Sequence, residues 1–250
     1  MIDWPELLMG ATALALGGVL KGATGAGAPL LAVPVLAMLY DIRLAVALFT
    51  FPSLVPNIWQ GWAYRHNLPP SALVFGFALG GAVGAGVGTA MLVSLSPDLL
   101  MLGVAVAVLI YVTFRLAQPD WALDMRVAVR LAVPMGLAGG VLQGATGLSA
   151  PVSITFMNAI RMERRAFIAA IAVFFAVMAV IQIPLLVAWG VLTPMRAVLS
   201  AGALLPLMGA MPLGAALASR MSPAAFDRII LGLLTLISVR IGIGALMSFR

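Results

Sequence analysis

The chain has 250 residues, of which 63% are hydrophobic and 9% charged, with a formal net charge of +6 and no cysteine. A soluble domain of this size needs far more surface charge, so the composition predicts an all-α polytopic membrane protein. The arginines stand singly or in small groups between apolar segments, which argues against a nucleic-acid-binding surface, and the lack of cysteine excludes disulfides and thiolate chemistry.

The first apolar segment covers residues 6–20. It begins at Glu6, after Asp3 and with no basic residue before it, whereas a cleavable signal peptide begins with a positively charged region. We therefore expect this segment to belong to the mature protein.

Nine further apolar segments follow, separated by short polar stretches. They cover residues 28–40, 44–63, 71–93, 97–114, 127–142, 150–160, 166–189, 196–218 and 226–248. Stretches of this kind recur along the whole chain, as bilayer-spanning helices require.

The second half of the chain repeats the first. GGVLKGATGAGAP at 17–29 and GGVLQGATGLSAP at 139–151 agree at ten of thirteen positions, 122 residues apart. Further matched pairs are Asp41 with Glu163, Arg43 with Arg165, Gln60 with Gln182 and, at an offset of 126, Ser96-Pro97 with Ser222-Pro223. We predict two homologous halves, 1–119 and 126–250, joined by a linker at 120–125 into one membrane domain, because many transporters arise by internal duplication.

The segments at 6–20 and 28–40 determine the topology of each half. As one helix their 35 residues would run about 52 Å, too long for a hydrocarbon core of about 30 Å. The glycines between them favour a break near 21–28. The pair either crosses the membrane as a broken helix or turns back as a re-entrant hairpin with arms of 15 and 13 residues.

The arginines distinguish these two topologies. Without Lys21 and Arg240, which we expect to lie within the membrane, a crossing pair divides the loop and terminal arginines six to six between the two sides. A hairpin divides them nine to three, with Arg43, Arg196 and Arg250 in the minority. The positive-inside rule favours the hairpin. We predict inverted repeats in the cell (inner) membrane, each a broken re-entrant hairpin plus three transmembrane helices, with both termini outside.

The repeated glycine-rich breaks are the candidate binding site. Their backbone cannot face lipid, and the arm that restarts after each break offers N–H groups and a positive dipole end to an anion. Lys21 adds a full charge where the second copy has Gln143. We predict that a small anion binds between the breaks, contacting Lys21, Gly22, Thr24, Gly25, Gly27, Gln143, Gly144, Thr146, Gly147, Ser149 and, from matched positions outside the breaks, Gln60 and Gln182. The alternative is that the glycines only allow close helix packing, which we expect for Gly80, Gly84 and Gly88.

No catalytic residue, metal ligand or cofactor is predicted. All eight acidic residues lie at termini or in loops, which argues against a proton relay within the membrane. The expected partners are a small anionic substrate and the lipid bilayer, with no nucleic acid. The sequence leaves a coupling ion and homo-oligomerisation open.

A glycine-rich break, an apolar arm and a short Asp41-Ile-Arg43 loop, with the break repeated at the start of the second half, resemble the TauE/SafE family of membrane permeases. The resemblance implies transport of a small sulfur-containing anion such as sulfite, sulfoacetate or a related organosulfonate. Members commonly carry glycine where this chain has Ala23, Ala26 and Ala28, which leaves the substrate open.

The membrane potential suggests the direction of transport. It drives an uncoupled dianion outward with about 4.6 kcal/mol per 100 mV when the cytoplasm is negative. We therefore expect export, since uptake would require a coupling ion. The alternative functions are an anion channel with the same site and, less favoured, a membrane-embedded enzyme.

Overall fold

The computed structural model describes residues 4–118, 121–218, 232, 235–236 and 239. The predicted apolar segment at 226–248 therefore lies outside the described residues, apart from four positions. Ser222-Pro223 and the arginines at 220, 228, 240 and 250 lie outside them as well.

Residues 4–118 and 121–218 form helices joined by short turns, and the described residues contain no strand. In chain order the helices are α1 (Trp4–Thr24), α2 (Ala28–Leu39), α3 (Ile42–Leu48), α4 (Thr50–Ala63), the 3-10 turn η1 (Arg65–Asn67), α5 (Ser71–Ser94), α6 (Pro97–Ala117), α7 (Met125–Thr146), α8 (Ala150–Ala159), α9 (Arg164–Ala188) and α10 (Pro194–Ala218). Within the described part of the chain, seven helical segments, with α3 and α4 taken together as one, are long and apolar enough to cross a membrane. The prediction of an all-α, multi-pass membrane protein is confirmed.

Side-chain caps fix where several helices begin. The carboxylate of Asp41 accepts hydrogen bonds from the Arg43 and Leu44 N–H groups at 2.7 and 3.0 Å, which starts α3. Asp124 caps α7 in the same way, with 2.8 Å to the Arg126 N–H. Such caps satisfy N–H groups that have no partner within the helix.

The two glycine-rich breaks are shorter than predicted. Lys21 to Thr24 continue α1, so the first pair of helices has 21 and 12 residues rather than arms of 15 and 13. The chain turns only at Gly25, whose φ of +87° suits glycine, and Gly147 after α7 turns with φ +73°. The last turn of α1 is closed by the Gly25 N–H, which donates to the Lys21 carbonyl at 2.7 Å, while the Thr24 hydroxyl donates to the Leu20 carbonyl at 2.8 Å.

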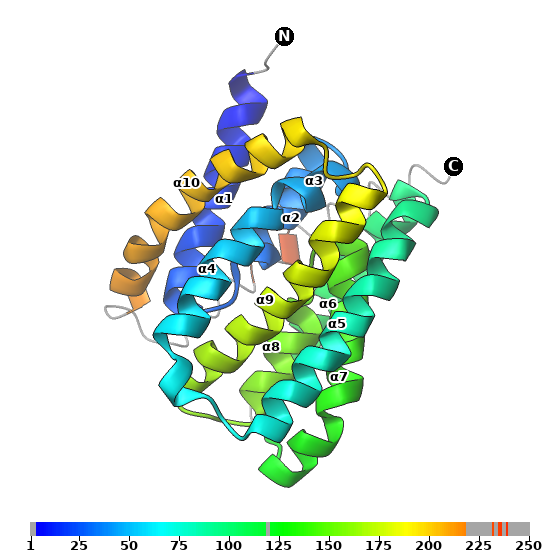
Figure 1. Ribbon diagram of the computed structural model, residues 1–250. Coiled ribbons are helices and arrows are strands. Elements are labelled where there is room, and N and C mark those ends of the chain that lie inside the picture. The colour runs from blue at the N-terminus through cyan, green and yellow to red at the C-terminus, as the bar shows by residue number, and fades with distance from the viewer. Residues whose placement is uncertain (1–3, 119–120, 219–231, 233–234, 237–238, 240–250) are drawn as a thin grey trace.

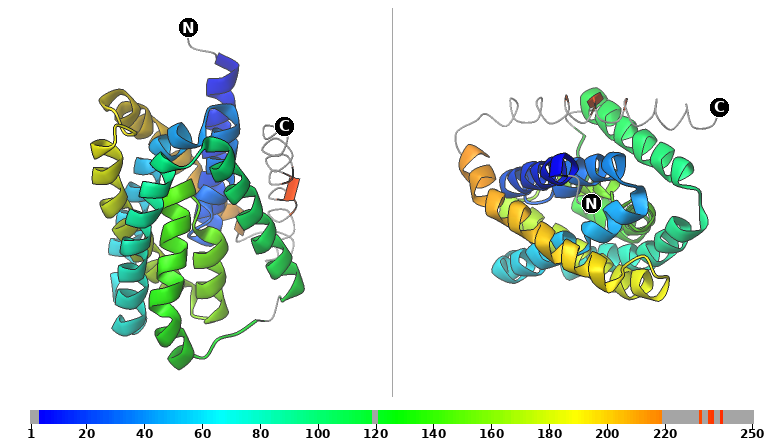
Figure 2. Two further views of the ribbon diagram at one scale, coloured as in Figure 1. Left: turned by 90° about the vertical axis from the view of Figure 1, so that its right-hand side faces the viewer. Right: turned by 90° about the horizontal axis from the view of Figure 1, so that it is seen from above.

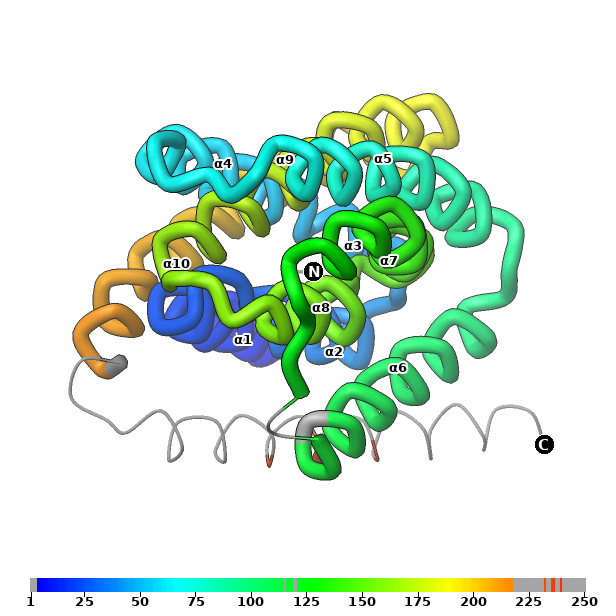
Figure 3. The backbone as a smooth tube through the Cα atoms, turned by 90° about the horizontal axis from the view of Figure 1, so that it is seen from below, coloured from blue at the N-terminus to red at the C-terminus, as the bar shows by residue number. Residues whose placement is uncertain are grey.

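In Figure 1 α1 runs downward from the N-terminus, whereas α7 runs upward from its first residue at the lower end. The side view in Figure 2 shows the same opposed directions. Seen from below, α8 lies near the middle of the bundle, with α1 on one side and α6 on the other (Figure 3).

Glycines bring two pairs of helices into backbone contact. Gly80, Gly84 and Gly88 of α5 face carbonyl oxygens of α7 so closely that a Cβ atom has no room. These three glycines pack helices together, as predicted.

Equivalent glycines join α1 to α10 and α7 to α5. In each case the missing Cβ makes room for a backbone carbonyl of the partner helix. The matched contacts are Gly18 with Leu207 and Gly140 with Gly81, then Gly22 with Met211 and Gly144 with Ala85. The α1 and α7 residues differ by 122 positions and their partners in α10 and α5 by 126, which are the two offsets found in the sequence.

Candidate functional site

Lys21 lies near the end of α1 with its side chain inside the bundle and 2% of its surface exposed. Its Nζ donates to Asn57 Oδ1 at 2.8 Å and to the Gly25 carbonyl at 3.4 Å. Both acceptors are neutral, and no carboxylate among the described residues forms an ion pair with Lys21. An ammonium group buried in this way is costly unless a counter-charge reaches it.

Asn57 belongs to a row of buried polar side chains on α4. Thr50, Ser53, Asn57 and Gln60 are each at most 7% exposed. Their spacing of three, four and three residues places them on one face of the helix. Only Gln60 was predicted for the site, although this spacing is visible in the sequence and could have identified the other three.

Gln143, the counterpart of Lys21, holds the second turn together. Its Oε1 accepts a hydrogen bond from the Ser149 N–H at 3.2 Å. The Ser149 hydroxyl is fully buried and lies 3.1 Å from the Ser153 hydroxyl. The Thr146 hydroxyl donates back to the Leu142 carbonyl at 2.7 Å. The two copies of the motif therefore differ in role, because Lys21 brings a charge and Gln143 closes a turn.

Backbone N–H groups of the first turn are partly occupied. The Thr24 hydroxyl oxygen accepts from the Ala26 and Gly27 N–H groups at 3.3 and 3.2 Å. The Leu30 N–H donates to the Gly27 carbonyl at 3.1 Å. These donors were predicted to be open to an anion, so positive charge at the first turn depends mainly on Lys21.

Two small cavities lie on either side of the junction between α3 and α4. Each has a volume of about 10 Å³, enough for about one water molecule. Lys21 and Asn57 line one cavity, Gln143 and Gln182 line the other, and both cavities are lined by Phe49 and Ser53. The structure thus brings the charged part of the first repeat and the amides of the second to the two sides of one short stretch of chain.

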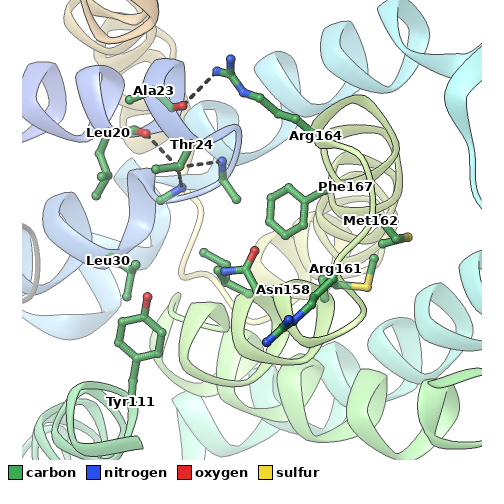
Figure 4. A pocket seen from close by; sticks show the side chains of 14 residues that line it. Leu20, Ala23, Thr24, Leu30, Tyr111, Asn158, Arg161, Met162, Arg164 and Phe167 are labelled. Carbon is green, nitrogen blue, oxygen red and sulfur yellow. Dashed lines mark hydrogen bonds between the residues drawn. The ribbon is translucent and has the colours of Figure 1, made fainter. Parts of the chain in front are cut away.

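Two larger cavities lie beside the first turn. One, of about 610 Å³, is lined among others by Gln60, Glu163 and Arg165. The other, of about 310 Å³, is lined among others by Thr24 and Arg161. Arg164 lines both. Figure 4 shows the smaller of the two, with the Arg164 guanidinium donating to the carbonyl of Ala23 at 2.9 Å.

The predicted site residues are therefore spread over several places. Lys21, Gln143, Gly147 and Gln182 line the two small cavities. Gly22, Gly25 and Gln60 line the 610 Å³ cavity, and Thr24 and Gly27 line the 310 Å³ cavity.

The remaining three predicted residues lie inside the fold. Thr146 and Ser149 are buried, and Gly144 faces the backbone of α5. Gln182 donates to the Gly144 carbonyl at 3.3 Å, whereas Gln60 Oε1 is buried without a hydrogen-bond partner among the described residues. The repeat-matched glutamines therefore have different surroundings.

Comparison with known proteins identifies the family of the chain. No curated protein and no solved structure matches the chain. A family model described as sulfite exporter TauE/SafE matches residues 10–241, nearly the whole chain. The members of this family are membrane transporters that act on small molecules. The chain belongs to the TauE/SafE family.

Proposed function

We propose that the protein transports a small sulfur-containing anion, such as sulfite, sulfoacetate or a related organosulfonate, with Lys21 as its counter-charge. The observation that carries this proposal is the burial of the Lys21 ammonium against two neutral acceptors. A buried cation without a carboxylate partner favours an anionic ligand, because the ligand supplies the missing charge. Gln143, Gln182 and the α4 residues Ser53 and Asn57 surround the same junction and offer hydrogen bonds to oxyanion oxygens.

The matched glycine contacts support an arrangement of two inverted repeats, 1–119 and 126–250 with a linker at 120–125. Equivalent residues of α1 and α7 contact equivalent residues of α10 and α5. The opposed directions of α1 and α7 in Figure 1 suit repeats that are inverted rather than parallel. In this proposal each half is a re-entrant hairpin followed by three transmembrane helices.

The size of the cavities favours a carrier over an open channel. The small cavities lined by Lys21 and by Gln143 hold about one water each, whereas sulfite has four heavy atoms. The anion therefore enters only if the turns or the α3–α4 junction move, which is the behaviour of a carrier with alternating access.

Export is supported by the end at which the larger cavities lie. They are lined by Arg161, Arg164 and Arg165, and arginine-rich ends face the cytoplasm under the positive-inside rule. A cytoplasmic cavity is where an exporter in the inner membrane would load its substrate.

In proteoliposomes with an imposed potential, anion flux toward the positive side without any added cation gradient supports uncoupled export. Dependence of the flux on Na⁺ or on a proton gradient contradicts it.

The central test is replacement of Lys21 by methionine. We expect the purified wild-type protein to gain thermal stability from sulfite or isethionate and the Lys21→Met variant to lose that gain, because a ligand stabilises only a state that it binds. The melting temperature without ligand should not fall, since the substitution removes a buried charge. Arg130→Met is the matched control, because it removes a positive charge from an exposed position on α7. An unchanged anion-induced shift in Lys21→Met rules out this site.

A further inference from the structure

The 610 Å³ cavity has a nearly closed counterpart that the sequence repeat relates to it. Three of the residues that line the large cavity have equivalents, 122 positions away, that line one of the two small cavities of about 10 Å³. The pairs are Gln60 with Gln182, Gly25 with Gly147 and Ile168 with Val46. Equivalent positions of the two repeats therefore surround a large space in one case and almost none in the other.

A hydrogen bond that closes the small cavity has no equivalent at the large one. Gln182 donates to the Gly144 carbonyl at 3.3 Å, which joins α9 to α7. The equivalent residues, Gln60 and Gly22, both line the 610 Å³ cavity, and the Gln60 amide oxygen is buried with no hydrogen-bond partner among the described residues. The matching bond, from the Gln60 amide to the Gly22 carbonyl of α1, is therefore not formed.

Arg43 ties α3 to the end of α5. Its Nε donates to the Leu92 carbonyl at 3.1 Å, and its Nη2 donates to the Val93 and Leu95 carbonyls at 3.2 and 3.1 Å. These carbonyls stand at the C-terminal end of α5, where a helix has unpaired acceptors and a partial negative charge. Three bonds from one guanidinium thus hold the two elements together at this end of the bundle.

Arg165, the equivalent of Arg43, makes no such bond. It is exposed at the start of α9, and its guanidinium forms no hydrogen bond with any residue that the structure describes. It lines the 610 Å³ cavity together with residues of α10. At the offset of 126 that relates α5 to α10, Leu92 corresponds to Ala218, the last residue of α10. In Figure 1 α3 lies near the upper end of the bundle and α9 begins near the lower end, so the two arginines belong to opposite ends.

We propose that Arg43 and Arg165 are two latches that close in turn, and that the structure is the state in which Arg43 closes the outer side and the cytoplasmic side is open. In the opposite state Arg165 bonds the carbonyl of Ala218 at the end of α10, and Gln60 bonds the Gly22 carbonyl. Arg43 then releases α5, and the two repeats exchange conformations, as alternating access requires. This inference rests on the proposed inverted-repeat carrier and names the contacts that open and close it.

The labelling rates of two single cysteines test the latches in the full chain, in membranes without any anion. Val46→Cys reports on the small cavity and Ile168→Cys on the large one, and the native side chains are 3% and 5% exposed. A membrane-impermeant thiol reagent should react with Ile168→Cys from the cytoplasmic side and leave Val46→Cys unlabelled. Arg43→Gln should raise the rate at Val46→Cys from the outer side by about tenfold or more and lower the rate at Ile168→Cys, because the lost charge-assisted bonds favour the opposite state.

A second substitution tests the other latch. Adding Arg165→Gln to Arg43→Gln should reverse both shifts, because each state then lacks its latch. Arg130→Gln is the matched control: it removes a positive charge from an exposed position on α7 and should leave the shifts unchanged. Shifts that Arg165→Gln fails to reverse overturn its role as the second latch.

Opposite changes at the two cysteines distinguish a latch from a contact that only stabilises the fold. Faster labelling of both cysteines in Arg43→Gln shows a loosened bundle and overturns the proposal, as do unchanged rates. If Arg43→Gln does not reach the membrane, Arg43→Lys is used; it keeps the charge without the fork of donors and should shift both rates in the same directions by less, and no shift overturns the proposal. Because no anion is present, failure of the latches leaves the Lys21 test standing, and an unchanged anion-induced shift in Lys21→Met leaves this one. Reaction of both cysteines from one side overturns the inverted repeats themselves.

Discussion

Lys21 and Asn57 form a buried pair that carries one positive charge and no negative charge. Asn57 Oδ1 accepts from Lys21 Nζ at 2.8 Å, and its amide N–H donates to the Ser53 carbonyl. Asparagine therefore holds the ammonium in place without neutralising it. A carboxylate of the same size would lose the hydrogen bond to the Ser53 carbonyl, but it would neutralise the ammonium and so remove the need for a bound anion.

Asn57→Asp should therefore neutralise Lys21 and weaken the binding of an anion. We expect a higher melting temperature without ligand, because the buried lysine gains a counter-ion, and anion binding weakened by about tenfold or more. Thermal unfolding with and without sulfite measures both effects. Asn57→Leu is the control: it removes the hydrogen bond but keeps Lys21 unpaired, so it should retain more of the anion-dependent shift than Asn57→Asp. Equal binding by Asn57→Asp and wild type would exclude a charge role for this pair.

The sequence predicted Lys21 but missed Asn57, Ser53 and Thr50. Lys21 is recognisable because it is a charged residue directly after an apolar segment and part of a repeated motif. The α4 residues are uncharged, and Asn57 and Ser53 correspond to Ala179 and Phe175 in the second half, so a search for repeats passes over them. Their helical spacing was the available signal.

At the level of elements, the two hairpin turns look alike in sequence but are stabilised differently. Thr24 accepts hydrogen bonds from the Ala26 and Gly27 N–H groups of its turn. The second turn uses Gln143, whose amide oxygen accepts from the Ser149 N–H. The Thr146 hydroxyl donates a hydrogen bond within its own helix, to the Leu142 carbonyl.

Thr24→Val should consequently destabilise the protein more than Thr146→Val. Valine keeps the shape of threonine but leaves the Ala26 and Gly27 N–H groups without their acceptor, which costs about 1–3 kcal/mol. Thr146→Val loses only a hydroxyl donor to a carbonyl that the helix already bonds, so we expect less than about 1 kcal/mol. Denaturation of both variants under identical detergent conditions measures the difference. Equal losses would show that Thr24 does not cap the first turn.

The backbone contacts between helices give a second prediction at this scale. Gly140→Ala places a Cβ against the Gly81 carbonyl of α5, which forces α5 and α7 apart and should cost about 1–3 kcal/mol. Gly103→Ala in α6 is the control, because nothing lies within 4 Å of its added Cβ and alanine favours the helix by up to about 1 kcal/mol. Melting temperatures of the two variants should therefore shift in opposite directions.

Helix existence was predictable, whereas the extent of the helices at the breaks was not. The glycines of KGATGAGAP predict a break near 21–28, yet Gly22 lies within α1, where the missing Cβ leaves room for the α10 backbone at Met211. Only the glycine with positive φ ends each helix. These contacts depend on a partner helix far away in the sequence, so no local pattern reveals them.

At the scale of the whole molecule, hydrogen bonds between helices show which helix ends lie at the same end of the bundle. The Leu123 N–H donates to the Ala159 carbonyl at 2.7 Å, which joins the chain before α7 to the end of α8. Arg164 bonds the end of α1. The start of α4 is joined to α10 at the other end, where the Phe51 N–H donates to the Ser200 hydroxyl at 3.0 Å. The ends rich in arginine are thus grouped together, and under the positive-inside rule this group faces the cytoplasm.

Single cysteines can test this orientation, because the chain has no cysteine of its own. Leu68, after α4, and Met195, at the start of α10, are 43% and 68% exposed, so replacing either leaves the core intact. In the inverted arrangement the two positions lie on opposite sides, because one hairpin and an odd number of crossings separate them. In a parallel arrangement with four crossings in each half they share a side. A membrane-impermeant maleimide applied to intact cells should label Met195→Cys and reach Leu68→Cys only after permeabilisation. Labelling of both positions from one side would establish parallel halves, and labelling of Leu68→Cys alone would keep the repeats inverted but place both termini in the cytoplasm.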